Sequence, residues 1–231
     1  MYKRAGFTIV ELLVVVAILA ALLTILFPAM RSVRQGAGVT ACQANQSQIF
    51  FGIKMYAMSY KNYYPDPIPG RGTANWVHHG NSEANMLNGA LGRFIDDAWV
   101  YHCPADGPKF RRGRKTLRSY SMPPGGRSTG GWNTQFNREY GMVKLDRTMI
   151  MLEEMDPRGA NLGTWVTNKN RWVDWVAYFH IDGTNLLFAD GHIDHYLFQD
   201  DESKKITWFF YNPRSKRDVN YIFSIMPWNV R

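Results

Sequence analysis

Hydrophobic and polar positions divide the sequence into a continuous apolar run, an amphipathic segment and a mixed remainder. The apolar run covers residues 7–30 and contains one carboxylate, Glu11. A helix over this run would be about 36 Å long, which is enough to cross the hydrocarbon core of a bilayer. The pattern therefore predicts that residues 7–30 form a helix that spans a membrane.

Apolar residues continue beyond Pro28 with the spacing of one helical face. This spacing predicts that the helix continues over residues 31–62 and ends before Pro65. Pro28 and two glycines, Gly36 and Gly38, are expected to break or soften it, and the glycines act either as a simple weak point or as a hinge. The recurring apolar residues are Val33, Ala37, Ala41, Ala44, Ile49, Ile53, Tyr56, Ala57 and Tyr60.

Residues 63–231 are expected to form one compact head with many loops and antiparallel strands. Residues 62–147 hold many Pro and Gly residues and show no sustained period, which is typical of turns. Residues 149–153 form one strand candidate, and residues 206–211 form another. Together these elements predict an α+β fold in which the long N-terminal helix packs on an antiparallel sheet.

Two Asp-Gly pairs give the strongest local signal in the head. Asp182-Gly183 and Asp190-Gly191 are each flanked by apolar residues that suit strands. Such pairs favour the type I′ hairpin turn, in which both central residues have positive φ. We therefore expect a three-stranded meander whose strands are residues 172–181, 185–189 and 192–198.

The chain contains two cysteines, Cys42 and Cys103. A membrane anchor would place the head outside the cytoplasm, where an even count of cysteines favours a disulfide. The bridge would close a loop of about 60 residues and contribute roughly 4 kcal/mol of stability. Two free buried thiols are the alternative.

Composition and charge add little to this outline. Aromatic residues make up 14% of the chain and include eight Trp, which suits a core or a subunit interface. The net charge of +8 is weak evidence for a polyanionic partner. The basic run from Lys109 to Arg118 is interpreted as an exposed loop, and contact with nucleic acid, anionic lipid or polysaccharide is the alternative.

We expect Glu11 to have a partner, because placing an unpaired carboxylate near the end of a membrane span costs about 1 to 3 kcal/mol of free energy. A short basic leader, residues 1–6, precedes the apolar run and ends in Gly6. A cut after Gly6 would give Phe7 a positively charged α-amine about one helical turn from Glu11. We expect this amine, in the same chain or in a neighbouring one, to be the partner and to set the register between subunits.

The stretch GFTIVELLVVVAILAALL, which begins at Gly6, resembles the processing site and first helix of type IV pilins and type II secretion pseudopilins. The resemblance implies that a prepilin peptidase cuts between Gly6 and Phe7 and methylates the amine of Phe7. It also implies that Glu11 is the acidic residue of the mature helix, and Pro28 matches a proline near the end of the family's apolar half. An ordinary secretory signal fits less well, because its apolar core has about 7 to 15 residues before a small-x-small cleavage site.

By this resemblance the chain is a structural subunit. It implies a single-pass precursor in the bacterial inner membrane with an extracytoplasmic head. Its partners would be prepilin peptidase, an assembly machinery and other copies of the subunit. The mature chain would polymerise into a type IV pilus at the cell surface or a periplasmic type II secretion pseudopilus. The alternative is a monomeric, membrane-anchored binding module that never polymerises.

A second resemblance lies near the C-terminus. His180, nine intervening residues and then Asp190-Gly191 are similar to the signature of the prepilin-type processing-associated group. The segments CQANQSQIFFGIKMYAMSYKNYYP, HCPAD and RSYSM agree with the same group. This resemblance implies a pilin-like fold, and we expect His180, Asp190 and Gly191 to be structural residues.

Metal binding is a weaker hypothesis for the same segment. Its histidines and aspartates are numerous enough to hold a divalent ion. Strand alternation, however, places His192 and Asp194 on one face and His195 on the other, which spoils the simplest three-ligand site. The residues are therefore interpreted as structural.

Calcium is a further possibility, because some pseudopilins that the chain resembles bind it in a C-terminal loop. Asp200, Asp201 and Glu202 are the candidate ligands, and turn-forming, solvated carboxylates are the default interpretation. The sequence contains no Ser-His-Asp order, nucleophile elbow, phosphate loop or CxxC pair. Neither an enzyme activity nor a cofactor is therefore predicted.

Overall fold

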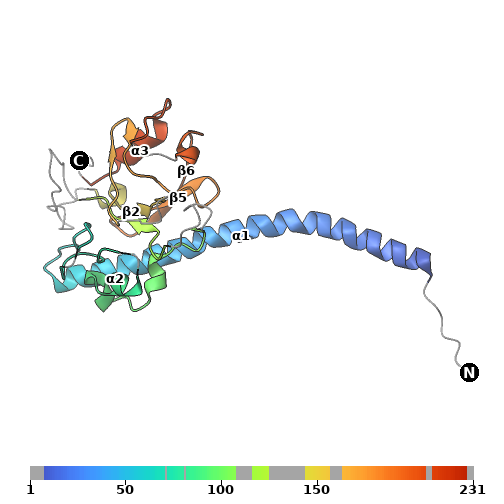
Figure 1. The fold of residues 1–231 in the computed structure, drawn as a ribbon, viewed down its shortest axis with the longest axis horizontal. Helices are drawn as coiled ribbons and strands as arrows, with labels where there is room; N and C mark the ends of the chain where they lie inside the picture. Colours follow the sequence, from blue (N-terminus) through green and yellow to red (C-terminus); the bar gives the residue numbers. More distant parts are fainter. Residues whose placement is uncertain are drawn as a thin grey trace, which may run out of the picture. The chain divides into compact units, whose positions relative to one another are not determined.

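The computed structural model shows an α+β protein with one long helix and an antiparallel sheet, as the sequence predicts (Figure 1). Contacts divide the chain into two units, residues 1–37 and residues 38–231. The structure describes residues 8–70, 72–80, 82–107, 116–124, 144–156, 163–206 and 210–227.

Helix α1 runs from Ile9 to Ser59 and includes Pro28. The prediction of one long helix is confirmed. The helix is not broken at Pro28 or at the glycines that follow, because a proline removes only one backbone donor while the neighbouring turns keep theirs. The N–H of Asn62 donates to the carbonyl of Ala57 over 2.8 Å and closes the last turn before Pro65.

Four antiparallel strands form the sheet of the second unit in the order β1, β2, β5, β6. Their bounds are Tyr120–Ser121 (β1), Met149–Glu153 (β2), Gly183–Phe188 (β5) and Ile193–Leu197 (β6). A separate hairpin pairs Thr167–Asn168 (β3) with Arg171–Trp172 (β4). The strands predicted at residues 149–153, 185–189 and 192–198 are confirmed to within about two residues.

The strand predicted over residues 172–181 is wrong. Within it only Trp172 belongs to a strand, β4, and β2 takes the expected place beside β5. Residues 175–177 are buried, and the N–H of Ala177 donates to the carbonyl of Glu153 over 2.9 Å, so this segment packs in the core without a regular ladder. Apolar composition indicates burial, and a buried irregular segment has the same composition as a buried strand.

Both turns beside β5 differ from the expected Asp-Gly geometry. In the first turn, positive φ falls on Ile181 (47°) and Asp182 (58°), and the N–H of Gly183 donates to the carbonyl of His180 over 2.8 Å. Gly183 is already the first residue of β5 and pairs with β6, which places the turn one residue earlier than predicted. In the second turn, only the glycine of the Asp-Gly pair, Gly191, has positive φ (99°). The prediction of type I′ turns centred on the two pairs is therefore wrong.

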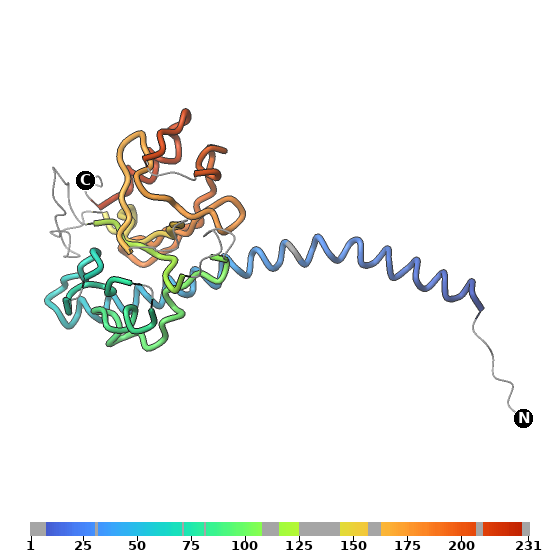
Figure 2. Tube along the Cα trace, viewed as in Figure 1, coloured from blue at the N-terminus to red at the C-terminus, as the bar shows by residue number. Residues whose placement is uncertain are grey.

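The strands β1, β2 and β5 are buried on both faces of the sheet, whereas the edge strand β6 is partly exposed. Residues 38–59 of α1 pack on one face, and helix α3 (Arg217–Ser224) packs with several Trp side chains on the other. Alternation along β5 produces this arrangement, because Leu187 lies in the core with α1 whereas Leu186 and Phe188 lie in the core with α3. In Figure 2 the trace of residues 60–70, 72–80 and 82–107 curls around this end of α1.

The remaining elements are short. Helix α2 covers Glu83–Leu87, and 3₁₀ helices cover Ala90–Arg93, Ala98–Tyr101, Leu145–Arg147 and Ser203–Lys205. The strand expected at residues 206–211 is not present at residues 206, 210 and 211, while residues 207–209 lie outside the described part of the chain.

Candidate functional site

The predicted processing site cannot be placed in the structure. Gly6 and Phe7 lie outside the described residues, which begin with Thr8. Cleavage after Gly6 and methylation of Phe7 therefore stay predictions. The described part of the N-terminal region is the first turn of α1, which contains Glu11.

Thr8 and Glu11 form a capping box at the start of α1. Oγ1 of Thr8 accepts a hydrogen bond from the N–H of Glu11 over 3.2 Å. Oε2 of Glu11 accepts hydrogen bonds from the N–H and from the hydroxyl of Thr8, both over 2.8 Å. This box satisfies two backbone donors at the helix start and places the carboxylate at the positive end of the helix dipole.

The capping box adds a partner to the one expected from the sequence. Thr8 of the same chain donates to Glu11, whereas the pairing of Glu11 with the amine of Phe7 stays a prediction because Phe7 lies outside the described residues. The spacing Thr-x-x-Glu before an apolar run is a sequence signal for this motif, and it predicts the contact without a structure.

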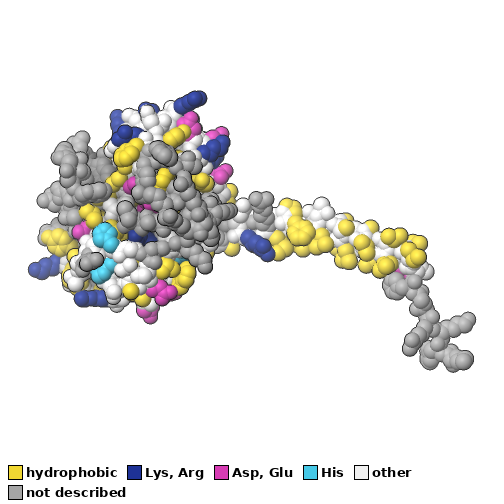
Figure 3. Space-filling view, in the orientation of Figure 1, with side chains coloured by type: hydrophobic (Ala, Val, Ile, Leu, Met, Phe, Trp, Pro, Cys, Tyr) yellow, Lys and Arg dark blue, Asp and Glu magenta, His cyan; other side chains and the backbone are white. Residues whose placement is uncertain are grey.

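The first unit exposes an apolar helix surface. Along residues 9–30 of α1 the side chains are exposed all round, including those of Ile9 (78%), Leu22 (59%) and Phe27 (66%). Figure 3 shows hydrophobic side chains along this helix. Water does not favour so large an apolar surface, so it needs lipid or protein neighbours. Among the described residues, α1 is the one helix long and apolar enough to cross a membrane, a criterion of length and composition alone.

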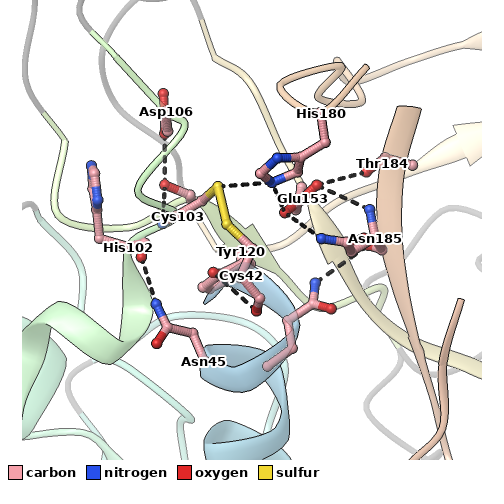
Figure 4. The surroundings of a disulfide bond; sticks show 12 residues. Cys42, Asn45, His102, Cys103, Asp106, Tyr120, Glu153, His180, Thr184 and Asn185 are labelled. Carbon is pink, nitrogen blue, oxygen red and sulfur yellow. Dashed lines mark hydrogen bonds and ion pairs between the residues drawn. A yellow bond between two sulfur atoms is a disulfide. The ribbon is translucent and has the colours of Figure 1, made fainter. Parts of the chain in front are cut away.

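In the second unit a disulfide links Cys42 of α1 to Cys103, which lies 61 positions further along the chain (Figure 4). Both cysteines are fully buried. The N–H of Cys103 donates to the hydroxyl of Ser119 over 3.0 Å, and this hydroxyl donates to Asp106 over 2.6 Å. The bridge therefore ties a hydrogen-bonded loop to the helix that supports the sheet.

A buried pair, Glu153 and His180, lies against the disulfide (Figure 4). Nε2 of His180 is 3.2 Å from Sγ of Cys103 and 3.1 Å from Oε1 of Glu153. The Glu153 carboxylate also accepts hydrogen bonds from the N–H of Asn185 (2.9 Å), the amide of Asn185 (3.2 Å) and the hydroxyl of Thr184 (3.5 Å). A fully buried carboxylate is tolerated only with several donors, and these groups provide them.

His180 and the pair Asp190-Gly191 do not form one site. They lie in the turns at opposite ends of β5, so the nine-residue spacing corresponds to one strand with its turns. His180 belongs to the buried cluster, whereas Oδ1 of the exposed Asp190 lies 2.6 Å from Nδ1 of His192. Gly191 has no space for a side chain, because a Cβ atom there would lie 2.4 Å from Cε1 of Phe50. Structural roles for the three residues stay predictions that these contacts support.

The three acidic residues proposed for calcium have separate protein partners. These are Ser215 and Asp218 for Asp200, Lys204 for Asp201, and Tyr211 and Arg214 for Glu202. Asp200 is buried, and Asp201 is exposed. Calcium binding by this loop stays a prediction.

The basic run is only partly described. Residues 108–115 lie outside the described part of the chain, and contact of this run with nucleic acid or polysaccharide stays a prediction. Its last residue, Arg118, is 1% exposed and donates to the carbonyl of His78 over 3.4 Å. The expectation of an exposed loop is therefore wrong at Arg118, which is a core residue.

One group of metal-ligating side chains converges among the described residues. Its members are Cys42, Cys103, Glu153 and His180, whose donor atoms all lie within 4.8 Å of one another. From the sequence, the cysteines are a disulfide candidate and His180 is a signature residue, whereas Glu153 is only the end of a strand. A carboxylate in the apolar strand MIMLE is the signal that could have found it.

Comparison with known families adds one finding. Residues 1–27 match the family model of the prokaryotic N-terminal methylation motif. The match includes Gly6, Phe7 and Glu11 and confirms the resemblance of this region to type IV pilins and pseudopilins. It ends before the head, so the resemblance to the prepilin-type processing-associated group stays a prediction. No curated protein and no solved structure matches the chain.

Proposed function

We propose that this chain is a prepilin-like structural subunit. A prepilin peptidase cuts it between Gly6 and Phe7 and methylates the new amine. The mature chain then polymerises through its apolar helix into a type IV pilus or a type II secretion pseudopilus. The head together with the part of α1 that packs on it, residues 38–231, stays outside the cytoplasm, and its role is structural rather than catalytic.

The methylation motif at residues 1–27 is the observation that carries this proposal. The exposed apolar surface of α1 over residues 9–30 supports it, because such a surface suits a bilayer before assembly and neighbouring helices after assembly. The disulfide between Cys42 and Cys103 supports a head outside the cytoplasm, since disulfides persist in oxidising compartments.

Glu11 supplies the register of polymerisation in this proposal. Thr8 engages its Oε2 atom, and among the described residues Oε1 accepts no hydrogen bond. After cleavage, the amine of Phe7 from the same or an adjacent subunit becomes a cation at that depth. The attraction of unit charges about 4 Å apart rises from about 1 kcal/mol in water to about 4 kcal/mol at an effective dielectric near 20. An attraction of about 4 kcal/mol is enough to favour one register between apolar helix surfaces that are otherwise uniform.

The second candidate is a monomeric, membrane-anchored binding module, and one observation favours it. The capping box gives Glu11 hydrogen-bond partners within a single chain, so the carboxylate does not by itself require a neighbouring subunit. This candidate leaves the methylation motif without a role, which is why polymerisation is preferred.

Filament formation by the intact protein tests the proposal. Fibres are sheared from cells and quantified against total mature protein with an antibody to the head, and intact cells are examined by immunogold microscopy. We expect labelled fibres for a pilus, or short assemblies captured by crosslinking in the periplasm for a pseudopilus. Gly6→Val, which blocks the predicted cleavage, is the matched control and should give neither. Mature wild-type protein that stays monomeric after crosslinking contradicts polymerisation and favours the binding module.

A further inference from the structure

Four side chains with metal-binding chemistry meet at one point inside the head (Figure 4). Cys42 comes from α1, Cys103 from the loop after a 3₁₀ helix, Glu153 from the end of β2 and His180 from the turn before β5. All four residues are buried, and one donor atom from each lies within 4.8 Å of the other three. Because four segments far apart in the sequence supply them, the arrangement depends on the complete fold of the head.

The chemistry of these donors matches zinc. Two thiolates, one imidazole nitrogen and one carboxylate oxygen make a four-coordinate set of the kind that structural zinc sites use. Bond lengths of about 2.3 Å to sulfur and about 2.0–2.2 Å to nitrogen or oxygen place tetrahedral donors roughly 3.3–3.8 Å apart. The 3.2 Å between His180 Nε2 and Cys103 Sγ and the 3.1 Å between Nε2 and Glu153 Oε1 are close to this spacing.

We propose that the head binds one zinc ion at Cys42, Cys103, Glu153 and His180 when the two cysteines are thiols. The disulfide and the zinc site then exclude each other, because both use the sulfur atoms of Cys42 and Cys103. Each of them links α1 to the loop that contains Cys103. When zinc binds, both thiols become thiolates and release two protons. When the thiolates are oxidised, they pass two electrons to a disulfide oxidant, the sulfur–sulfur bond forms and the ion leaves.

The groups around the four ligands are already arranged for this role. The N–H of Asn185 and the hydroxyl of Thr184 hold Oε2 of the Glu153 carboxylate, and the amide of Asn185 donates to Oε1, the oxygen that faces His180 (Figure 4). Nε2 of His180 faces both the sulfur of Cys103 and Oε1 of Glu153. To bind the ion, the neutral imidazole takes the tautomer with its proton on Nδ1, and Nε2 then presents a lone pair to the ion. Once the sulfurs are not bonded, rotation of the cysteine side chains allows the wider spacing of a zinc site.

Cobalt titration of the reduced full-length protein in detergent tests this proposal. A water-soluble phosphine reduces the disulfide, is itself oxidised to the phosphine oxide, and is removed under anaerobic conditions. We expect one cobalt ion per chain, with the intense visible bands of a tetrahedral site and the charge-transfer absorption of two thiolates. The first ion to bind the metal-free, reduced protein should release two protons. Zinc should then displace the cobalt at one equivalent without further proton release, and it should slow reoxidation at least tenfold. The oxidised protein is the control and should bind neither ion at this site.

Variants assign the ligands. His180→Gln and Glu153→Gln should each weaken zinc binding at least tenfold, and Cys103→Ser should remove part of the thiolate absorption. His192→Gln replaces a histidine outside the cluster and should bind zinc as the wild type does. Circular dichroism shows whether each reduced variant folds. If a ligand variant does not fold, the cobalt spectrum of the reduced wild-type protein decides whether the site binds metal.

Two results would overturn the zinc site. The first is a reduced wild-type protein that gives the weak spectrum of octahedral cobalt, or that stays unfolded when zinc is added. The second is wild-type zinc affinity in a folded His180→Gln variant. The site does not depend on polymerisation, so neither result bears on the proposed filament.

Discussion

Glu11→Gln and Thr8→Val separate the two roles that the structure leaves open for the Glu11 carboxylate. Glutamine at the third position of a helix still completes a capping box, so Glu11→Gln removes the charge and keeps the cap. Thr8→Val keeps the charge and the branched shape of the side chain and removes the hydroxyl that bonds to Glu11 at 2.8 Å and 3.2 Å.

The magnitudes of the two effects differ enough to be measured. Losing the cap costs about 1 kcal/mol, which is roughly fivefold in an equilibrium constant. Losing an ion pair between Glu11 and the amine of Phe7 costs up to about 4 kcal/mol at low dielectric, or roughly a thousandfold for each subunit added. We therefore expect filament yield to fall more than tenfold in Glu11→Gln and less than fivefold in Thr8→Val. Glu11→Asp, which keeps the charge but shortens its reach, should be intermediate.

The assay is the amount of sheared fibre divided by total mature protein in the same cells. Cleavage after Gly6 and insertion into the membrane should be unaffected in all three variants, and this is checked on the same blots. A loss in Glu11→Gln that does not exceed the loss in Thr8→Val would refute a charge pairing of this strength. Unchanged yield in Glu11→Gln would refute both the pairing and the register that it sets.

Three further predictions concern the stability of the head, and denaturant unfolding of the purified protein measures all of them. Cys42→Ser and Cys103→Ser should each lower the free energy of unfolding by about 4 kcal/mol, because the bridge closes a loop between residues 61 positions apart. The double variant should cost little more than either single variant, and additive losses would contradict the bridge. Gly191→Ala should cost about 1–3 kcal/mol because of its φ of 99° and because an added Cβ would meet Phe50. Gly107→Ala, also in the head, should cost little because an added Cβ there has nothing within 4 Å among the described residues; equal effects would disprove this explanation. Asp218→Ala should lower the free energy of unfolding by about 3 kcal/mol, because the buried carboxylate accepts hydrogen bonds from Tyr196, Gln199 and Asp200. Asp201 is exposed, so Asp201→Ala should leave the stability unchanged. An unchanged stability in Asp218→Ala would show that water replaces the carboxylate.

Periodic and local features of the fold could be predicted from the sequence. The helix follows from the continuous apolar run of residues 7–30 and from the helical spacing of the apolar residues beyond it. The strand β2 follows from an apolar segment, and β5 and β6 follow from the apolar residues that flank the Asp-Gly pairs. The pairing of the strands does not follow, because the segment at residues 175–177 is as apolar as a strand yet packs irregularly. The tertiary fold selects β2 as the neighbour of β5.

Some features of the candidate sites can also be predicted from the sequence, and others cannot. The motif around Gly6 and the capping box of Thr8 and Glu11 are contiguous in the sequence, so they can be identified without a structure. The contact between Glu153 and His180 joins residues 27 positions apart. It depends on the pairing of β2 with β5, so composition and spacing cannot predict it.

Intact-mass spectrometry of the protein purified from cell envelopes, with N-terminal sequencing, tests the prepilin-like assignment most directly. The expected product begins at Phe7, lacks residues 1–6 and carries one added methyl group on its α-amine. The same protein from cells without prepilin peptidase should keep its leader, which shows that the enzyme is responsible. Wild-type envelopes that contain only the chain starting at Met1 would contradict the assignment.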